Sequence, residues 1–157
     1  MNKALIAVFL LLMTMQVNAQ YTPRESMLGL RGGGSFGITY KKFFGKNFAF
    51  ESVVGNDFLS EEKPGVFVNA LFEKHAPLLG DKFSALIGAG PAYHFKRKSL
   101  GASGVIGLDW RILRAPVNLQ VDWMPTYYFS GEKNFSPVNG AVSIRYILNR
   151  KKMNENN

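Results

Sequence analysis

In Val117-Asn118-Leu119-Gln120-Val121-Asp122-Trp123, apolar and polar side chains alternate strictly. A period of two is typical of a β-strand that has one face against an apolar environment. The same alternation recurs along the chain after residue 27. The sequence therefore predicts an all-β fold with one apolar and one polar face.

The first 19 residues have the three parts of a secretory signal peptide. Lys3 supplies the positive charge, residues 4–15 form an apolar run, and Val17-Asn18-Ala19 offers small residues for cleavage after Ala19. Because a membrane-spanning helix needs about 20 apolar residues, this run is too short to be an anchor. We expect residues 1–19 to be removed and the chain to be exported.

Composition excludes several classes of protein. The chain has no cysteine, which excludes a disulfide scaffold, thiol catalysis and a lipoprotein acylated on cysteine. Its net charge of +8 could suit nucleic acid, but export makes that partner unexpected. The clusters Lys96-Arg97-Lys98 and Arg150-Lys151-Lys152 resemble a loop tip and a tail. The first of them could also contact lipopolysaccharide phosphates.

Turn-forming residues divide the chain into eight extended segments. They are expected at 27–33, 36–44, 47–55, 65–75, 83–95, 101–113, 116–129 and 138–148. No later segment is apolar enough for a spanning helix, so insertion into a membrane would use strands. An even number of strands puts both ends of a barrel on one side. We predict an eight-stranded antiparallel up-and-down transmembrane β-barrel over residues 20–148, followed by a polar tail at 149–157.

The apolar positions of these segments predict a lipid-facing surface. Its central band would be Ile38, Val54, Val68, Ile87, Ile106, Leu108, Leu119, Val121, Val142 and Ile144. Barrels place aromatic girdles at both membrane interfaces. The girdle nearer the periplasm would be Tyr40, Phe44, Phe48, Phe72, Trp110 and Tyr146. The outer girdle would be Phe36, Tyr93, Phe95, Tyr127 and Phe129.

Alternation alone does not say which face is inside. An inverted barrel would be a soluble, periplasmic, lipocalin-like cup that binds an apolar ligand. The polar face also carries small residues, which suit a crowded lumen and favour the membrane barrel. They are Gly33, Gly37, Gly88, Gly90, Ala92 and Gly107.

Charged residues at the inward positions predict a network that plugs the lumen. They are Arg31, Lys41, Glu51, Glu73, Asp109, Arg111, Asp122 and Arg145. Unpaired buried charges are costly, and an eight-stranded barrel is only wide enough for side chains. We therefore expect ion pairs rather than a channel, with Arg145 facing some of Glu73, Asp109 and Asp122.

Signs of catalysis are few. The only histidines, His75 and His94, do not stand in a metal-binding spacing, and the glycine runs do not open a helix after a strand. We expect no catalytic residue, cofactor or metal. A triad built from distant Ser, His and Asp side chains stays open, and with it a lipid A-modifying enzyme.

The chain resembles the small outer-membrane β-barrel proteins of Gram-negative bacteria, of the OmpA-like or OmpX-like eight-stranded kind. The resemblance lies in residues 29–32, 37–44, 88–90, 106–110, 121–125 and 140–146. It implies a monomer in the outer membrane, in contact with lipid and lipopolysaccharide, inserted by the barrel assembly machinery. That machinery reads alternating apolar residues in the last strand, here Val142, Ile144, Tyr146 and Leu148. Leu148 stands where the family has a terminal aromatic residue.

Overall fold

The structure is a computed structural model that describes residues 24–45, 47–58, 64–79, 82–112, 115–131, 134–137 and 139–148. The predicted signal peptide at 1–19 and the predicted tail at 149–157 lie outside the described residues. The basic cluster at 150–152 lies outside them as well.

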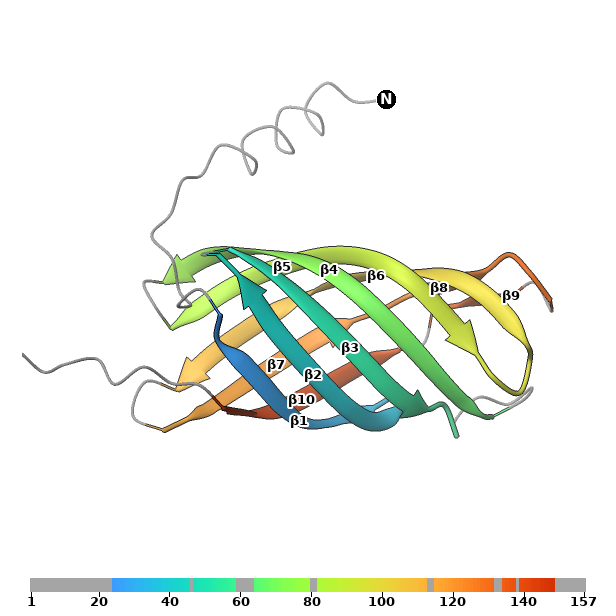
Figure 1. The fold of residues 1–157 in the computed structure, drawn as a ribbon, viewed down its shortest axis with the longest axis horizontal. Coiled ribbons are helices and arrows are strands. Elements are labelled where there is room, and N and C mark those ends of the chain that lie inside the picture. Colours follow the sequence, from blue (N-terminus) through green and yellow to red (C-terminus); the bar gives the residue numbers. More distant parts are fainter. Residues whose placement is uncertain are drawn as a thin grey trace, which may run out of the picture.

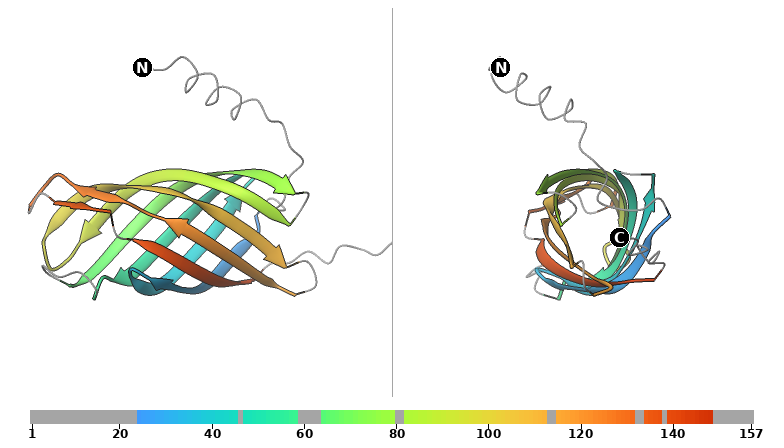
Figure 2. Two further views of the ribbon diagram at one scale, coloured as in Figure 1. Left: turned by 180° about the vertical axis from the view of Figure 1, so that it is seen from behind. Right: turned by 90° about the vertical axis from the view of Figure 1, so that its left-hand side faces the viewer.

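The described chain is a closed antiparallel barrel (Figure 1). Its strands are β1 (Ser26–Gly33), β2 (Phe36–Phe44), β3 (Phe48–Asn56), β4 (Val66–Leu79), β5 (Phe83–His94), β6 (Ser99–Ile112), β7 (Val117–Trp123), β8 (Thr126–Tyr128), β9 (Asn134–Ser136) and β10 (Gly140–Ile147). The sheet runs in the order β5-β4-β3-β2-β1-β10-β7-β6-β8-β9, and pairing of β5 with β6 closes it. Figure 2 shows the closed ring from one end.

The ten strands form an eight-stranded wall because two of the wall's strands are each interrupted once. Strands β7 and β8 both pair with β6 and are separated by Met124-Pro125, while β9 pairs with β8 and β10 pairs with β7. Proline has no N–H to donate, so it interrupts a ladder of hydrogen bonds. The prediction of an all-β, antiparallel, eight-stranded barrel is confirmed. Residues 134–136, predicted as part of a loop, form β9 instead.

Strand β4 is longer than predicted. The sequence predicts that this strand ends at residue 75, before Pro77, but the strand continues to Leu79. The pairing of β4 with β5 shifts register between Pro77 and Leu79. Such an irregularity accommodates a proline inside a strand. The connection between β4 and β5 is therefore shorter than predicted.

The two ends of the barrel differ in what they hold. We call the end with Ser26 and Ile147 the terminal end and the end with Gly33 and Gly140 the loop end. At the terminal end, the N–H of Leu148 donates to the carbonyl oxygen of Ser26 over 2.8 Å. Both ends of the described chain therefore lie on the same side, at the left in Figure 1, as an even number of strands requires.

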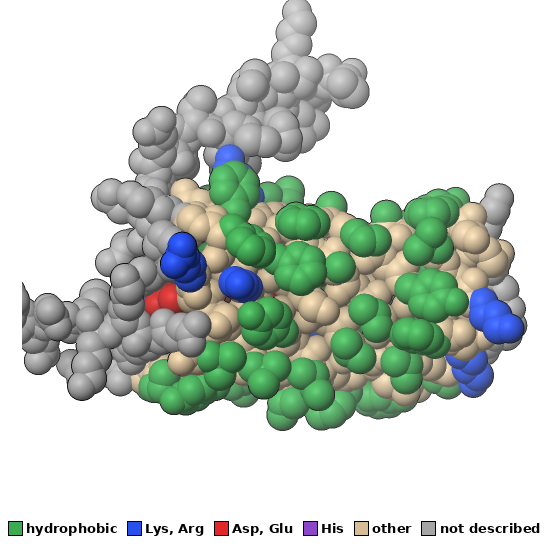
Figure 3. Space-filling model, viewed as in Figure 1, with side chains coloured by type: hydrophobic (Ala, Val, Ile, Leu, Met, Phe, Trp, Pro, Cys, Tyr) green, Lys and Arg blue, Asp and Glu red, His purple; other side chains and the backbone are tan. Residues whose placement is uncertain are grey.

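The outer surface of the barrel is apolar. All residues of the predicted central band point outward; Val68 and Leu119 are half-buried and the others are exposed. Every predicted girdle residue also points outward, although Tyr40 and Phe72 lie near the middle of their strands rather than at an end. Figure 3 shows apolar side chains over one face of the barrel, with Lys and Arg side chains toward its two ends.

The interior is not uniformly polar, which the sequence analysis missed. One apolar cluster lies at the terminal end and consists of Met27, Phe43, Ala49 and Ile147. A second lies mainly on β3 to β6 and consists of Val53, Phe67, Leu71, Leu86, Val105 and Met124. A barrel of this size is filled by side chains, so positions without a charge partner are packed with apolar groups.

No helix in the described part of the chain is long and apolar enough to cross a membrane.

Candidate functional site

Four of the inward charges each face a glycine on an adjacent strand. The facing pairs are Arg145 with Gly29, Arg31 with Gly37, Glu73 with Gly88 and Asp122 with Gly107. A Cβ at Gly107 would lie 2.7 Å from the Cβ of Asp122, closer than real contacts allow. Glycine at these positions therefore makes room for the charged side chain beside it.

Arg31 and Asp122 form a bidentate ion pair between β1 and β7. The Arg31 guanidinium donates from Nη1 to Asp122 Oδ2 and lies with Nη2 near Oδ1, both at 2.7 Å. Gln120 donates to the same Oδ2 over 2.8 Å. Paired, hydrogen-bonded geometry of this kind is what a fully buried carboxylate requires.

Arg145 on β10 lies at the centre of the network. Its guanidinium contacts the carboxylate of Glu51. It also donates to Asn118 Oδ1 over 3.2 Å and to Gln120 Oε1 over 2.9 Å, and its Nε donates to Thr39 over 3.2 Å. The prediction that Arg145 faces Glu73, Asp109 or Asp122 was wrong about the contacting carboxylate, because the tilt of the strands brings β3 opposite β10.

Lys41 on β2 bridges two carboxyl groups. Its Nζ lies 3.1 Å from Glu51 Oε2 and 2.6 Å from Glu73 Oε2. It also donates to Gln120 Oε1 over 2.5 Å. Glu51 therefore holds both Arg145 and Lys41, and it is the most connected acid of the lumen.

Arg111 pairs with a carboxylate outside the predicted set. Its guanidinium pairs with Glu25 at 2.7 Å, a residue that the sequence analysis did not include, and its side chain is 12% exposed. Glu25 is thus a further buried carboxyl group, beside those of Glu51, Glu73, Asp109 and Asp122.

Neutral side chains complete the network and were missed by an analysis that counted only charges. Asn118 donates to Asp109 Oδ1 over 2.8 Å while accepting from Arg145, and Gln120 connects Lys41, Arg145 and Asp122. Both stand in the alternating stretch 117–123, on the same face as Asp122. Because they alternate with the apolar residues as Asp122 does, the sequence could have identified them as inward-facing.

A serine, a histidine and a carboxylate do meet inside the barrel. Ser84 Oγ lies 3.3 Å from His75 Nδ1, and His75 Nε2 lies 3.1 Å from Glu73 Oε2. This is the order of groups in a hydrolytic triad. All three side chains are buried, and the Phe43 ring packs against His75 at 4.9 Å between ring centres. Ser84 Oγ therefore lies inside the barrel, in a hydrogen-bond chain that links β4 and β5.

His94 belongs to a polar cap at the loop end. Its Nδ1 accepts the backbone N–H of Arg97 over 3.2 Å, and its Nε2 lies 3.3 Å from the Asp57 carboxylate. Asp57 also accepts the N–H of Gly65 over 2.7 Å and pairs with Arg97 at 3.6 Å. Both ring nitrogens of His94 are therefore engaged within the cap. Of the predicted loop-tip cluster, Lys96 and Lys98 are exposed and Arg97 turns inward.

The described residues contain no group of three or more His, Cys, Asp or Glu side chains that could hold a metal ion.

Comparison with protein-family models, with curated proteins and with solved structures finds no match for this chain.

Proposed function

We propose that this protein is an integral outer-membrane β-barrel with a structural or surface-interaction role, in which the charge network is a plug rather than a catalytic site. The observation that carries the proposal is the contrast between the two faces of the wall. Ile38, Ile87 and Ile144 are 55% to 57% exposed, whereas the side chains of Lys41 and Arg145 are 0% exposed. Lipid outside and side chains inside are the surroundings that suit such a wall.

The apolar surface supports contact with lipid because of its extent. Soluble monomers rarely expose continuous apolar patches larger than about a few hundred Å². Here exposed apolar side chains occur on every long strand of the wall, from Leu28 on β1 to Tyr146 on β10. Outer-membrane lipid is the partner that would cover this surface.

The loop end would face outward in this proposal. The chain is expected to enter from the periplasm, where the barrel assembly machinery would receive it, and both ends of the described barrel lie at the terminal end. Exposed Lys96 and Lys98 at the loop end would then lie at the level of lipopolysaccharide phosphates.

The two alternatives have less support. A lipocalin-like carrier needs an apolar lumen open to a ligand, but this lumen holds Arg31, Lys41 and Arg145 in ion pairs. A lipid-modifying enzyme needs an accessible nucleophile or base at the membrane boundary, and Ser84 is fully buried.

The test is heat modifiability of the protein in purified outer membranes. A folded barrel resists detergent at room temperature, so the unboiled protein is expected to migrate faster in a gel than the boiled protein. The soluble periplasmic fraction of the same cells is the control. Recovery in that fraction without a shift on boiling would overturn the proposal.

A further inference from the structure

Among the described residues, the fully exposed charged side chains all carry positive charge. In the described residues, Glu25, Glu51, Glu73, Asp109 and Asp122 are buried, and Asp57 is half-buried in the polar cap. Exposed charged side chains are cations: Arg24, Lys42 and Lys82 at the terminal end, and Lys96 and Lys98 at the loop end. The described outer surface is therefore suited to anionic partners at both ends.

A recess of about 590 Å³ collects two of these cations at the terminal end. It is lined by Arg24, Ser26, Tyr40, Lys42, Phe43, Phe44 and Gly45. Ser26 faces Lys42 across the β1–β2 pair, so its short side chain leaves a hollow beside the longer ones. The volume falls within the range of about 300 to 1,000 Å³ that is usual for ligand sites.

The chemistry of the recess suits a phosphate group at a membrane interface. Arg24 and Lys42 have no ion pair with a carboxylate of the described residues, so both can bind an added anion. Ser26 and Tyr40 add hydroxyl groups, and the rings of Tyr40 and Phe44 stand on either side of Lys42 along β2. Aromatic and basic side chains in combination favour the headgroup level of a bilayer.

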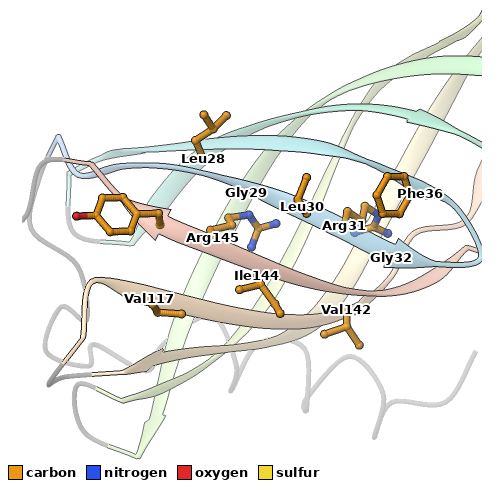
Figure 4. A pocket seen from close by; sticks show the side chains of 11 residues that line it. Leu28, Gly29, Leu30, Arg31, Gly32, Phe36, Val117, Val142, Ile144 and Arg145 are labelled. Atoms are coloured by element: carbon orange, nitrogen blue, oxygen red, sulfur yellow. The ribbon is translucent and has the colours of Figure 1, made fainter.

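An apolar groove begins one residue pair away from the recess. It has a volume of about 530 Å³ and is lined by Leu28, Leu30, Phe36, Val117, Val142, Ile144 and Tyr146, with Gly29, Gly32, Arg31 and Arg145 (Figure 4). Leu28 in the groove pairs with Tyr40 in the recess. The guanidinium groups of Arg31 and Arg145 are engaged in the lumen, which leaves the outer side of the groove to apolar groups.

We propose that the recess binds the phosphate headgroup of an anionic phospholipid, whose acyl chain lies in the groove along β1. This inference rests on the proposed membrane location. The recess supplies positive charge for the headgroup, and the groove supplies an apolar surface for the acyl chain. Strand β1 connects the two, because Ser26 lines the recess and Leu30 lines the groove. Near a membrane surface, each basic side chain strengthens the association of anionic lipid about fivefold.

The test measures lipid selectivity of the folded barrel in phosphatidylcholine vesicles. Phosphatidylglycerol or phosphatidylcholine with a spin label on the acyl chain is added, and the motionally restricted fraction of each gives their relative association constants. We expect phosphatidylglycerol to associate about fivefold or more strongly with the unmodified protein. Arg24→Gln with Lys42→Gln should reduce that ratio to about one.

The matched control is Lys96→Gln with Lys98→Gln, which removes the same charge at the loop end and should reduce the selectivity less than the Arg24 and Lys42 double variant does. An equal loss in both double variants, or no selectivity in the unmodified protein, overturns the inference. Loss of selectivity with inorganic phosphate, but not with chloride at equal ionic strength, would identify a site for free phosphate instead. Each sample is first checked for the heat-induced gel shift, so failure to insert is distinguished from failure to bind.

Discussion

The centre of the lumen and the polar cap at the loop end both bury charged groups, but they do so to different degrees. In the centre, Arg145, Lys41 and Glu51 all stand on strands, and their side chains are 0% to 1% exposed. In the cap, the side chains of His94 and Arg97 are 0% and 3% exposed, but that of Asp57, which follows the end of β3, is 20% exposed. The acid at the centre is thus fully buried between strands, whereas the acid of the cap stays in contact with water.

The physical reason is the cost of an imperfect ion pair. A buried charge that loses its partner keeps the full penalty of having left water. Strand register holds Arg145 and Glu51 in place from both sides, whereas Asp57 depends on the N–H of Gly65, across the connection between β3 and β4. Partial exposure lets water solvate part of the Asp57 carboxylate, which lowers the cost of an imperfect partner.

The largest effect is expected for Arg145→Met, which leaves Glu51 with one of its two cations. We expect a loss of about 3 to 5 kcal/mol in the free energy of unfolding, because the charge of Glu51 stays buried. The measurement is urea-induced unfolding in detergent micelles, followed by the heat-sensitive gel band. Lys42→Met, which removes an exposed cation, is the control and should change the unfolding free energy by less than about 0.5 kcal/mol. Equal midpoints for the two variants would refute the burial of the central network.

A smaller effect is expected for Gly107→Ala, which tests whether glycines make room for the charges. The added methyl group would meet Asp122 Cβ at 2.7 Å and disturb its pair with Arg31, so we expect a loss of about 1 to 3 kcal/mol. Gly104→Ala on the same strand is the control, since its nearest neighbour would be 4.0 Å away. The same unfolding assay compares them, and an equal change in both would mean that space beside Asp122 is not limiting.

The smallest effect is expected for Asp57→Ala in the cap. Hydrogen exchange of the Gly65 amide should rise about tenfold, since it loses a charged acceptor, while the amide of Arg145 in β10 should keep its rate. Exchange measured by NMR in micelles reports both sites in one sample. A matching rise at Arg145 would show that the cap and the centre are one cooperative unit rather than two.

Much of the fold could be predicted from the sequence because alternation is a local property. Strand β2 was predicted at 36–44 and lies at Phe36–Phe44, and the outward positions Ile38 and Ile144 followed from parity alone. The errors arose at prolines. Pro77 was interpreted as a turn although the β4–β5 ladder absorbs it with a register shift.

The sequence predicted which charged residues face the lumen, but not which of them form pairs. All eight predicted charges lie on the inward face, and Arg31, Lys41 and Arg145 are among the largest fully buried side chains. Thr39, Asn118 and Gln120 were missed, since neutral side chains carry no charge to count. The buried chain of Ser84, His75 and Glu73 depends on two neighbouring strands and has no local motif.

The sequence by itself determined the strands and the two faces of the wall, because a side chain in a strand points to the face set by its own position in the chain. Only the tertiary structure decided which charges meet. Arg145 and Glu51 are 94 residues apart, and their contact depends on how the strands tilt and shift as the sheet closes. Closure is a property of the whole ring, so no single stretch of the sequence contains it.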